Sequence, residues 1–582
     1  MTTLARFFDR LTRPRALGLV LALWAAIYLP GLGSLEIKGE EGRRILPAVA
    51  MLDTGDWLVP QVGGVPYFSK PPLINWLVAG AFKLTGTRGE WAARLPSVLA
   101  VLALGLAAVW TLSRSLGVGG ALLTAVFLLT NIGLMEKGRL AEIESVYLGL
   151  YGLALLAWLG GWRRDAEPSP EPCPTFPWRT WTLPFLFLGL GLLTKGPLHL
   201  VYFYAVVGAV LGFTGRWRDA LNWAHALGLG LMLGLFAAWA VPYFREMRAG
   251  EAAGKWYAQM AGRVEVGEKF SLSAWLLNGP RGLVNFLPWT CLLPLAWRSG
   301  ARVPPDAPSA APLDLAVARG LRWAVGVPFV AVSLAPGGIP RYTLPLLVPA
   351  AVGLGLAFAR LRPPGSPAGL ARVWAAVVAL CLALVIVGAP VAAGFGGGGG
   401  GRVLAAVLLP VAAACLLWRR DALRRFAEEG GAGSASSGGV PGVLPLALAS
   451  GAVMALLTAC YVLAQGHRFH RQESVRPVGL SVRRAVPAGE PVAALRPGFL
   501  PFLFYVNHLS YLQTPDHLPP GLRYLLVRQK DLPEATSSLA AQGVASRTVL
   551  NAWDKRLRDS RESDWVLLAL DRPENSPPKG SL

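Results

Sequence analysis

Charged residues are scarce in this chain, and their scarcity decides its broad class. Only 15% of the 582 residues are Asp, Glu, Lys or Arg, whereas 53% are hydrophobic. A soluble domain carries about 25% charged residues, so the composition excludes an ordinary water-soluble protein. The mean hydropathy of +0.46 agrees with that exclusion. We therefore expect a membrane protein.

Cysteine is also rare, and the five cysteines form no CxxC pair. Most of them lie inside or beside apolar runs, where cysteine behaves as a small buried hydrophobe. The pattern predicts neither a disulfide framework nor a cysteine metal site.

What the chain has instead is a series of apolar runs. They are roughly 18–22 residues long, the length that crosses a bilayer core of about 30 Å. The first run, Ala16 to Leu32, is not followed by a small-residue cleavage site, so we expect a retained span and not a signal peptide. We count thirteen candidate spans, near residues 15–33, 93–113, 118–135, 142–161, 181–195, 197–214, 222–243, 281–297, 322–337, 341–360, 370–391, 402–418 and 441–465.

Arginines at the ends of these runs predict the orientation. The formal net charge of +21 is not gathered in one basic domain, so we expect no nucleic-acid partner. Instead, basic pairs recur in alternate loops, which are cytoplasmic by the positive-inside rule. The N-terminus is then inside and, after an odd number of spans, the C-terminus is outside. The inside set includes Arg6, Arg10, Arg13, Arg15, Arg163, Arg164, Arg216, Arg218, Arg298, Arg302, Arg360, Arg362, Arg419, Arg420, Arg424 and Arg425.

This threading divides the chain into three parts. Residues 1–465 form the transmembrane domain, whose first outer loop, 34–92, contains interfacial helices. Residues 466–571 form a small α/β domain outside the membrane, because PVAAL, GLRYLLV and DWVLLAL are strand-like and LPEATSSLAAQG is helix-like with a glycine stop. Residues 572–582, rich in Pro, Asn, Ser and Gly, are expected to be disordered. The expected fold is an all-α multi-span membrane protein with this small soluble domain.

Ionisable groups gather in the predicted outer loops. Glu40, Glu41, Arg43 and Arg44 follow the first span, and a solvated helix start with acids near its N-terminus is the simple alternative. Lys70 stands between two aromatics and two prolines in GVPYFSKPPLINW. A loop that happens to end at a helix would explain this lysine equally simply.

Further along the chain, single charges mark other outer ends. Glu144 lies at or below the membrane edge, where an acid is costly unless it is paired or functional; a pair with Arg139 in the same turn is the alternative. Lys195 precedes a Gly-Pro break between two apolar runs, and snorkelling is its alternative explanation. Arg341 is a lone cation at another outer helix start.

Together these residues suit transfer of a group from a membrane-embedded phosphate ester. A carboxylate can act as general base on an acceptor hydroxyl. Cations can hold the phosphate and stabilise the charge that grows on it as it leaves. The cations expected on this face are Arg43, Lys70, Arg139, Lys195 and Arg341.

The segment EEGRR…AMLDTGDWLVPQVGGVPYFSKPPLINWL resembles the bacterial polyprenyl-phosphate-dependent glycosyltransferases. These enzymes belong to the C-type, multi-span superfamily that includes lipid A aminoarabinose transferases and protein O-mannosyltransferases. The family pattern is an acidic pair, one residue and Arg, then GDW, and later P-Y-F-x-K-P-P-L. GRLAEIE, TKGP, LPW and PRYTLP follow in the family's order, so the resemblance covers about residues 15–350.

The resemblance implies roles for individual residues. Glu40 stands at the family's catalytic acid, Glu144 at a second acid, and Glu41 completes the acidic pair among the catalytic candidates. Tyr67 and Lys70 match residues that bind the carrier phosphate, with Lys195 and Arg341 nearby. Arg43 and Arg139 would orient the carboxylates.

The chain also departs from the family pattern. Both acids are Glu where Asp is usual, and Ser69 replaces an acid that aminoarabinose transferases often carry. Loop 244–280 contains no histidine, so we expect no metal and no tightly bound cofactor. These departures put lipid A aminoarabinose transfer in particular in doubt.

The resemblance predicts a glycosyltransferase of the bacterial inner membrane. It would move a sugar from a polyprenyl-phosphate donor, such as an undecaprenyl-phosphate sugar, to a lipid, glycan or protein acceptor on the periplasmic face. The alternative is a transporter or flippase for an anionic phospholipid, which would need charges at mid-bilayer depth and a two-fold repeat. An intramembrane protease would need a Ser–His or paired Asp arrangement within spans, and the sequence has neither pattern.

Overall fold

The computed structural model describes most of the chain and divides it into two compact units. The described residues are 11–67, 70–166, 178–246, 254, 271–294, 311–360, 367–394, 407–414, 416, 444–472, 475–506, 509–553 and 564–571. The first unit comprises Met1–Pro30, Ser69–Leu73 and Pro96–Leu463, and the second comprises Gly31–Phe68, Ile74–Leu95 and Ala464–Leu582. The predicted tail at 572–582 lies outside the described residues.

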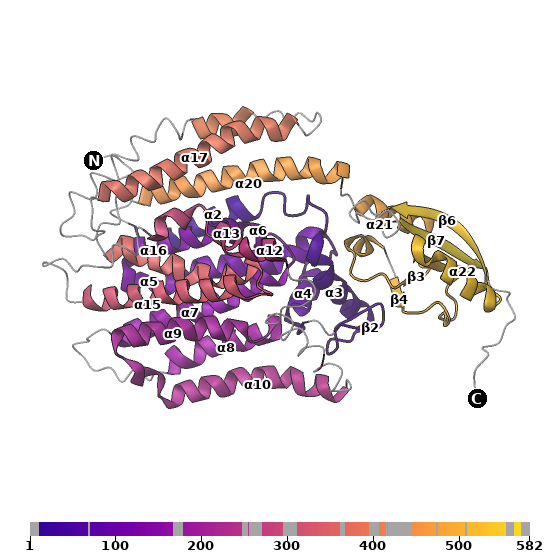
Figure 1. Ribbon diagram of the computed structural model, residues 1–582, viewed down its shortest axis with the longest axis horizontal. Helices are drawn as coiled ribbons and strands as arrows, with labels where there is room; N and C mark the ends of the chain where they lie inside the picture. The colour runs from indigo at the N-terminus through magenta and orange to yellow at the C-terminus, as the bar shows by residue number, and fades with distance from the viewer. Residues whose placement is uncertain are drawn as a thin grey trace. The chain divides into compact units, whose positions relative to one another are not determined.

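The first unit is built from long apolar helices, as the hydropathy predicts (Figure 1). Among the described residues, six helical segments are long and apolar enough to cross a membrane: Glu90–Leu129, Ile143–Ala166, Trp223–Glu246, Pro312–Leu334, Pro340–Ala359 and Val373–Val391. The described part of the chain is therefore mostly helical, with six candidate membrane helices, and the count of thirteen spans stays a prediction. The helices are α2 (Arg13–Tyr28), α5 (Glu90–Leu129), α6 (Ile132–Lys137), α7 (Ile143–Ala166), α8 (Trp178–Lys195), α9 (Leu198–Thr214), α10 (Trp223–Glu246), α12 (Leu272–Leu276), α13 (Asn278–Val284), α15 (Ala311–Leu334), α16 (Leu347–Arg360), α17 (Pro367–Gly394) and α20 (Leu444–Gln472), with 3-10 turns η2 (Trp217–Ala220), η3 (Trp289–Cys291) and η4 (Pro340–Leu346).

Breaks between the helices fall where glycine and proline predict them. Gly117 interrupts α5 with φ 72°, a conformation that glycine adopts without strain, and it separates the predicted spans 93–113 and 118–135. Between α8 and α9, Gly196 has φ 100° and Pro197 follows it. The chain therefore turns directly after Lys195, as predicted.

One predicted span is not a continuous helix. In its described part, residues 281–294, α13 ends at Val284 and a turn over residues 285–288 separates it from η3. The carbonyl groups of Asn285 and Leu287 leave the helix ladder and accept hydrogen bonds from the backbone of Gly133 and Ile132. Pro288 also lacks the amide that would continue a helix.

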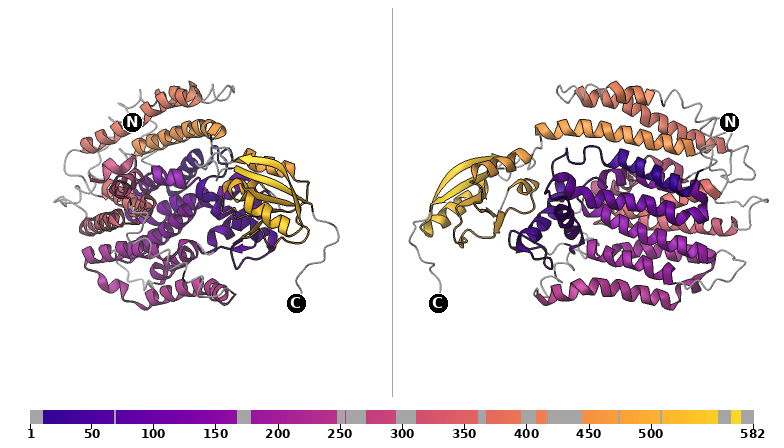
Figure 2. Two further views of the ribbon diagram at one scale, coloured as in Figure 1. Left: turned by 45° about the vertical axis from the view of Figure 1, so that its right-hand side comes forward. Right: turned by 180° about the vertical axis from the view of Figure 1, so that it is seen from behind.

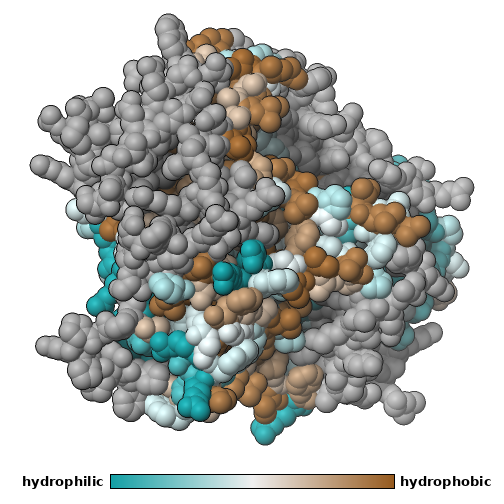
Figure 3. Space-filling view, turned by 60° about the vertical axis from the view of Figure 1, so that its left-hand side comes forward, coloured by the Kyte–Doolittle hydropathy of each residue, from teal (hydrophilic) through white to brown (hydrophobic). Residues whose placement is uncertain are grey.

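Close helix packing in the first unit depends on small residues. Helices α7, α8 and α10 run alongside one another in Figures 1 and 2, and α8 contacts both of the others. Where α5 approaches α16, a Cβ on Gly355 would overlap Thr124 Oγ1 and lie 3.1 Å from the Gly120 carbonyl oxygen. Small residues let membrane helices approach this closely. Hydrophobic side chains remain exposed over much of the coloured surface in Figure 3, as expected for helices that face lipid.

The second unit begins with the predicted first outer loop. It contains the 3-10 turn η1 (Gly39–Glu41), helix α3 (Gly42–Thr54), a short hairpin of β1 (Gln61–Val62) and β2 (Val65–Pro66), and helix α4 (Leu73–Thr85). Helix α3 lies in the loop where helices were predicted, and it ends at Gly55 with φ 77°. Helix α4 has 13 residues, fewer than the ~20 that a membrane span needs.

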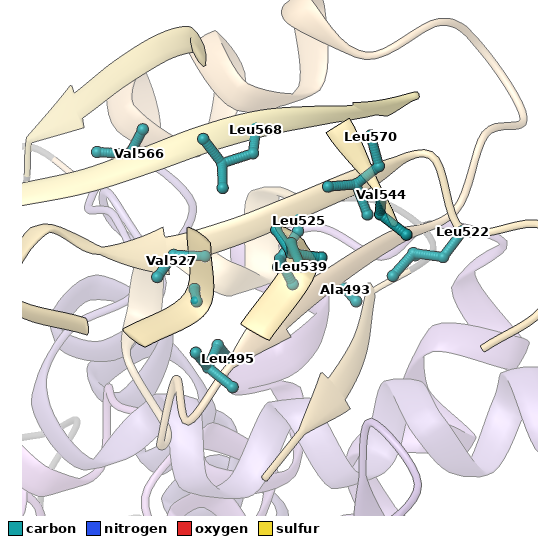
Figure 4. Close-up of a cluster of buried hydrophobic side chains, with 11 residues drawn as sticks. Ala493, Leu495, Leu522, Leu525, Val527, Leu539, Val544, Val566, Leu568 and Leu570 are labelled. Atoms are coloured by element: carbon teal, nitrogen blue, oxygen red, sulfur yellow. The ribbon is translucent and has the colours of Figure 1, made fainter. Parts of the chain in front are cut away.

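The C-terminal residues of the second unit form a five-stranded mixed sheet in the order β4-β3-β5-β7-β6. Strand β3 pairs in parallel with β4 and β5, whereas β7 pairs antiparallel with β5 and β6. Leu525, Leu539 and Leu568 belong to its apolar core (Figure 4). The predicted strands match β3, β5 and β7, and the predicted helix matches α22. The elements are α21 (Arg476–Ala485), β3 (Val492–Leu495), η5 (Pro501–Tyr505), β4 (Leu509–Leu512), β5 (Tyr524–Arg528), η6 (Gln529–Asp531), α22 (Leu532–Ala541), β6 (Ala545–Trp553) and β7 (Asp564–Asp571).

A buried ion pair holds the first outer loop in place. Arg94 Nε donates to Glu41 Oε1 at 2.8 Å, and both side chains are almost completely buried. The same guanidinium donates to Glu41 Oε2 and to the carbonyl groups of Leu32, Leu35 and Glu36. Glu41 also accepts from the backbone N–H of Lys38. One arginine therefore fixes the chain from Leu32 to Glu41.

The predicted domain boundary between residues 465 and 466 stays a prediction.

The packing of α5 against α16 gives a test. We expect Gly355→Ala to destabilise the protein by about 1–3 kcal/mol, the range for overpacking a close contact, because Thr124 and the Gly120 carbonyl have to move. Gly353→Ala on the same helix is the control, since its Cβ would meet only Leu321 Cβ at 4.0 Å. Thermal unfolding in detergent measures both. Equal melting temperatures for the two variants would contradict the proposed close contact.

The Arg94–Glu41 pair gives a second test. We expect Glu41→Gln to lower the free energy of unfolding by about 3–5 kcal/mol, because removing one partner leaves a buried charge uncompensated. Glu40→Gln is the matched control, since the Glu40 side chain is 35% exposed. A Glu41→Gln protein that melts at the same temperature as Glu40→Gln would show that the pair is not structural.

Candidate active site

The structure places the predicted site residues in two groups, one in each unit. Glu40, Glu41, Arg43 and Tyr67 belong to the second unit, whereas Lys70, Arg139, Glu144, Lys195 and Arg341 belong to the first. The prediction that all of them form one site stays a prediction.

The two neighbouring acids of the first outer loop have different environments. Glu41 is completely buried against Arg94, as described above. Glu40, the residue before it, points elsewhere and keeps 35% of its side chain exposed. Its Oε2 lies 3.4 Å from Arg43 and 3.8 Å from Arg44, one helical turn further along the chain. Glu40 can meet a substrate, while Glu41 anchors the turn that presents it.

Arg44 links Glu40 to Tyr67. Its guanidinium donates a hydrogen bond to the Tyr67 hydroxyl at 2.7 Å, and Tyr67 is 4% exposed. Asn75 of α4 donates in turn to the Arg44 carbonyl at 2.8 Å. The sequence prediction did not include Arg44 among the site residues, although it stands beside Arg43. Tyr67 follows the β1–β2 hairpin, whose tip brings it back to the first turn of α3.

Lys70 lies half-buried at the entrance to α4. Pro71 and Pro72 follow it and are both buried. Because proline fixes φ and has no amide donor, this pair restricts the backbone next to the lysine.

In the first unit, three predicted residues from distant parts of the chain come together around one carboxylate. Glu144 lies in the first turn of α7, and its Oε1 lies 3.1 Å from Lys195 Nζ at the end of α8. Arg341, in η4, approaches the same oxygen at 3.5 Å. The Glu144 side chain is 3% exposed, whereas Arg341 is 37% exposed. We call Glu144, Lys195 and Arg341 the Glu144 group.

Aromatic rings surround the lysine of the Glu144 group. Lys195 Nζ lies 5.4 Å from the centre of the Tyr147 ring and 5.5 Å from that of Tyr342. Buried His199 gives its backbone N–H to the Tyr147 hydroxyl at 2.6 Å. The space enclosed around these side chains is only about 10 Å³, too small for more than one water molecule. A ligand that binds Lys195 therefore has to move neighbouring side chains.

Arg139 and the acids near it are anchored within the first unit. Arg139 donates hydrogen bonds to the carbonyl groups of Ile27 and Pro30 at the end of α2. Lys137 lies 3.2 Å from Glu142 and 3.2 Å from Glu136. Desolvation lowers the pKa of Lys137, but these two carboxylates outweigh it and raise the pKa above its ordinary value. Lys137 therefore stays charged. The turn before α7 is therefore held by hydrogen bonds to the end of α2 and by ion pairs among its own residues.

A cavity of about 760 Å³ opens within the second unit, beside α3. Leu46, Val49, Ala50 and Asp53 recur at helical spacing on the wall that α3 provides, and Arg43 lies one turn before Leu46 on the same face. Opposite charges line the rest: Arg88 pairs with Asp53 at 2.7 Å and Arg476 pairs with Glu90. Arg483 adds a further positive charge from α21. The cavity therefore combines an apolar wall with a net positive lining.

Among the described residues, no three His, Cys, Asp or Glu side chains lie close enough to hold a metal ion. The expectation that no metal takes part stays a prediction.

Comparisons with known proteins agree with the predicted resemblance. The family model described as dolichyl-phosphate-mannose-protein mannosyltransferase matches residues 69–241. Undecaprenyl phosphate-alpha-4-amino-4-deoxy-L-arabinose arabinosyl transferase of Edwardsiella ictaluri is 27% identical over 58% of this chain and 57% of its own length. The enzyme of the same name from Pseudomonas aeruginosa is 28% identical over 64% of this chain and 65% of its own length. The chain thus spans less than two thirds of these curated relatives.

A solved structure shows the fold. ArnT from Cupriavidus metallidurans, in a crystal structure bound to undecaprenyl phosphate, superimposes with a TM-score of 0.68 at 19% identity, covering 95% of this chain and 97% of that one. The chain therefore has the ArnT fold, and its resemblance to the polyprenyl-phosphate-dependent glycosyltransferases of the C-type superfamily is confirmed.

Proposed function

We propose that the protein is an integral-membrane glycosyltransferase that moves a sugar from a polyprenyl-phosphate donor to a hydroxyl group of a lipid, glycan or protein acceptor. The observation that carries the proposal is an accessible carboxylate, Glu40, held beside Arg43 and Arg44 at a helix start. The confirmed resemblance supports it. The names of the curated relatives give the donor as an undecaprenyl-phosphate-linked aminoarabinose, and this is the first sugar to test.

In the proposed reaction the acceptor oxygen attacks the anomeric carbon of the donor sugar. The bond between that carbon and the phosphate oxygen breaks, and the phosphate leaves with the bonding electron pair. Glu40 takes the proton from the acceptor hydroxyl as general base. Arg43, 3.4 Å from Glu40, orients the carboxylate, and Arg44 holds the Tyr67 hydroxyl toward the same turn.

Phosphate binding falls to the cations. We assign Lys70, Lys195 and Arg341, together with Tyr67, to the carrier phosphate, because cations and hydroxyl donors stabilise the charge that grows on a leaving phosphate. Glu144 holds Lys195 and Arg341 at one point and supports catalysis by placing them. Arg139 holds the turn that leads to Glu144. Glu41 supports Glu40 structurally and does not touch substrate.

The acceptor would enter the cavity beside α3. The α3 face that lines this cavity starts at Arg43, which pairs with Glu40, so a bound acceptor could reach the proposed base. Arg88, Arg476 and Arg483 favour an acceptor that carries an anionic group next to its hydroxyl. A lipid, a glycan or a protein could present such a group.

The proposed location is the bacterial inner membrane, with the N-terminus in the cytoplasm and the C-terminal sheet in the periplasm. The transporter alternative finds little support. A transporter would need charges at mid-bilayer depth. The described ion pairs of the Glu144 group lie instead at helix ends.

The catalytic assignment is tested with purified protein in lipid and radiolabelled undecaprenyl-phosphate sugars. We expect Glu40→Gln to lower kcat by about 10²–10⁴-fold, the usual contribution of a general base, with little change in the KM for donor. Lys70→Ala should raise the KM for donor as well as lower kcat. Arg15→Gln, at the far end of α2, is the control for loss of a membrane-adjacent charge. Full activity in Glu40→Gln would remove this residue from the role of base.

The acceptor proposal is tested at Arg483. We expect Arg483→Gln to raise the KM for an anionic acceptor about tenfold or more, since a charge-assisted hydrogen bond is worth about 1.5–3 kcal/mol, and to leave the KM for donor unchanged. Arg523→Gln on the sheet, 71% exposed, is the matched control. An unchanged acceptor KM in Arg483→Gln would place the acceptor elsewhere.

A further inference from the structure

A turn far along the chain reaches the group of residues around Glu40. Phe499 follows strand β3, in a turn where Gly498 has φ 64°. Its ring meets the Tyr67 ring edge-on, with 5.1 Å between centroids and 73° between planes. The Arg43 guanidinium lies over the same ring at 5.9 Å. Gly42 leaves room for the Phe499 backbone, since a Cβ there would lie 2.6 Å from the Phe499 carbonyl oxygen.

We propose that Phe499 is a positioning residue for sugar transfer: it holds Arg43 and Tyr67 in the geometry that the proposed reaction needs. The inference rests on the proposed function and extends it, because it assigns part of the reacting site to the C-terminal segment. Phe499 itself touches no reacting atom and acts through the two side chains it contacts.

Arg43 needs such support. Its side chain is 49% exposed, and its partner Glu40 is 35% exposed. A long exposed side chain samples several rotamers, and an exposed ion pair alone restrains it only weakly. The face of an aromatic ring attracts a guanidinium, so Phe499 restricts Arg43 to the orientation in which it meets Glu40.

The turn that carries Phe499 is itself well anchored in the second unit. The backbone N–H of Tyr511, in β4, donates to the Gly63 carbonyl at the tip of the β1–β2 hairpin. The Tyr505 hydroxyl accepts from the backbone N–H of Ile37 and donates to Glu90. Burial raises the pKa of Tyr505, so this hydroxyl stays protonated and keeps donating. Tyr505 and Tyr511 therefore tie the C-terminal part of this unit to residues 37, 63 and 90 of the predicted first outer loop.

A ring that orients a cation differs from a ring that only fills space. Leucine replaces most of the volume of phenylalanine but has no aromatic face. Tyrosine keeps the face and adds a hydroxyl at the edge. The comparison of Phe499→Leu with Phe499→Tyr therefore separates orientation from packing.

The experiment measures kcat, KM for donor and melting temperature for Phe499→Ala, Phe499→Leu and Phe499→Tyr in the full-length protein. We expect kcat to fall about tenfold in the Ala and Leu variants. An aromatic contact and a cation–π contact each contribute a factor of about two to ten, and both variants lose the two contacts together. Phe499→Tyr should restore kcat. In an Arg43→Gln background, Phe499→Ala should have a much smaller effect, because coupled residues are not additive.

Phe502→Leu is the structural control. Phe502 is completely buried and packs on Trp565 in the sheet core, so its substitution should lower the melting temperature without a selective loss of kcat. Wild-type kcat in Phe499→Ala, or recovery by Leu as complete as by Tyr, would overturn the proposal.

If the wild-type protein transfers no sugar, the proposed function fails, and whether Phe499 holds Arg43 and Tyr67 in place is then tested separately by binding of the carrier lipid. The shift in melting temperature on adding undecaprenyl phosphate then provides the reading. A shift that is lost in Phe499→Ala and kept in Phe499→Tyr supports positioning by the ring, and an unchanged shift in Phe499→Ala overturns it.

Discussion

The second unit depends on one buried interaction, the pair between Arg94 and Glu41. A charge taken out of water is costly unless its partner and its remaining hydrogen bonds go with it. Arg94 meets this requirement with both Glu41 oxygens and three backbone carbonyl groups. The cost of burying the guanidinium therefore forces residues 32–41 into one path. Glu40 lies on that path directly before Glu41, so the interaction that satisfies Arg94 also fixes the position of the accessible carboxylate.

The same constraint explains why the charges of the first unit are found in compensated groups. Arg163 of α7 pairs with Asp314 of α15, and both side chains are almost completely buried. Glu144 is as deeply buried and has two cations. The difference matters. The charges of Arg163 and Asp314 cancel each other, which suits a structural link between two helices. The Glu144 group keeps a net positive charge.

The sequence predicted the parts of this arrangement that depend on local physics. The length of the apolar runs located most helices, because a span must be about 20 apolar residues long whatever it packs against. The Gly196–Pro197 break and the strands β3, β5 and β7 were likewise visible. The interruption of the predicted span 281–297 was not visible, because the Asn285 and Leu287 carbonyls bond to another helix, a tertiary contact that hydropathy does not report.

The site shows the same limit. Glu144, Lys195 and Arg341 were chosen separately as isolated charges at helix ends, and the structure brings them to one point. Arg94 and Phe499 were missed. Arg94 looks like one more arginine near an apolar run, and Phe499 lies in a different part of the chain from the residues it contacts. Their roles depend on pairings across long sequence separations, for which a single sequence carries no signal.

The charge balance of the Glu144 group links its geometry to the proposed chemistry. One carboxylate and two cations leave a net charge of +1 among the three side chains. A polyprenyl-phosphate sugar is a phosphodiester with one negative charge, so it would neutralise the group on binding. When the sugar leaves, the phosphate becomes a monoester and its negative charge grows toward about −1.5 to −2 at neutral pH. Lys195 and Arg341 would therefore bind the developing product more strongly than the donor. Stabilisation that increases as the bond breaks is what lowers a barrier, and Glu144 makes this possible by holding both cations in place without cancelling them.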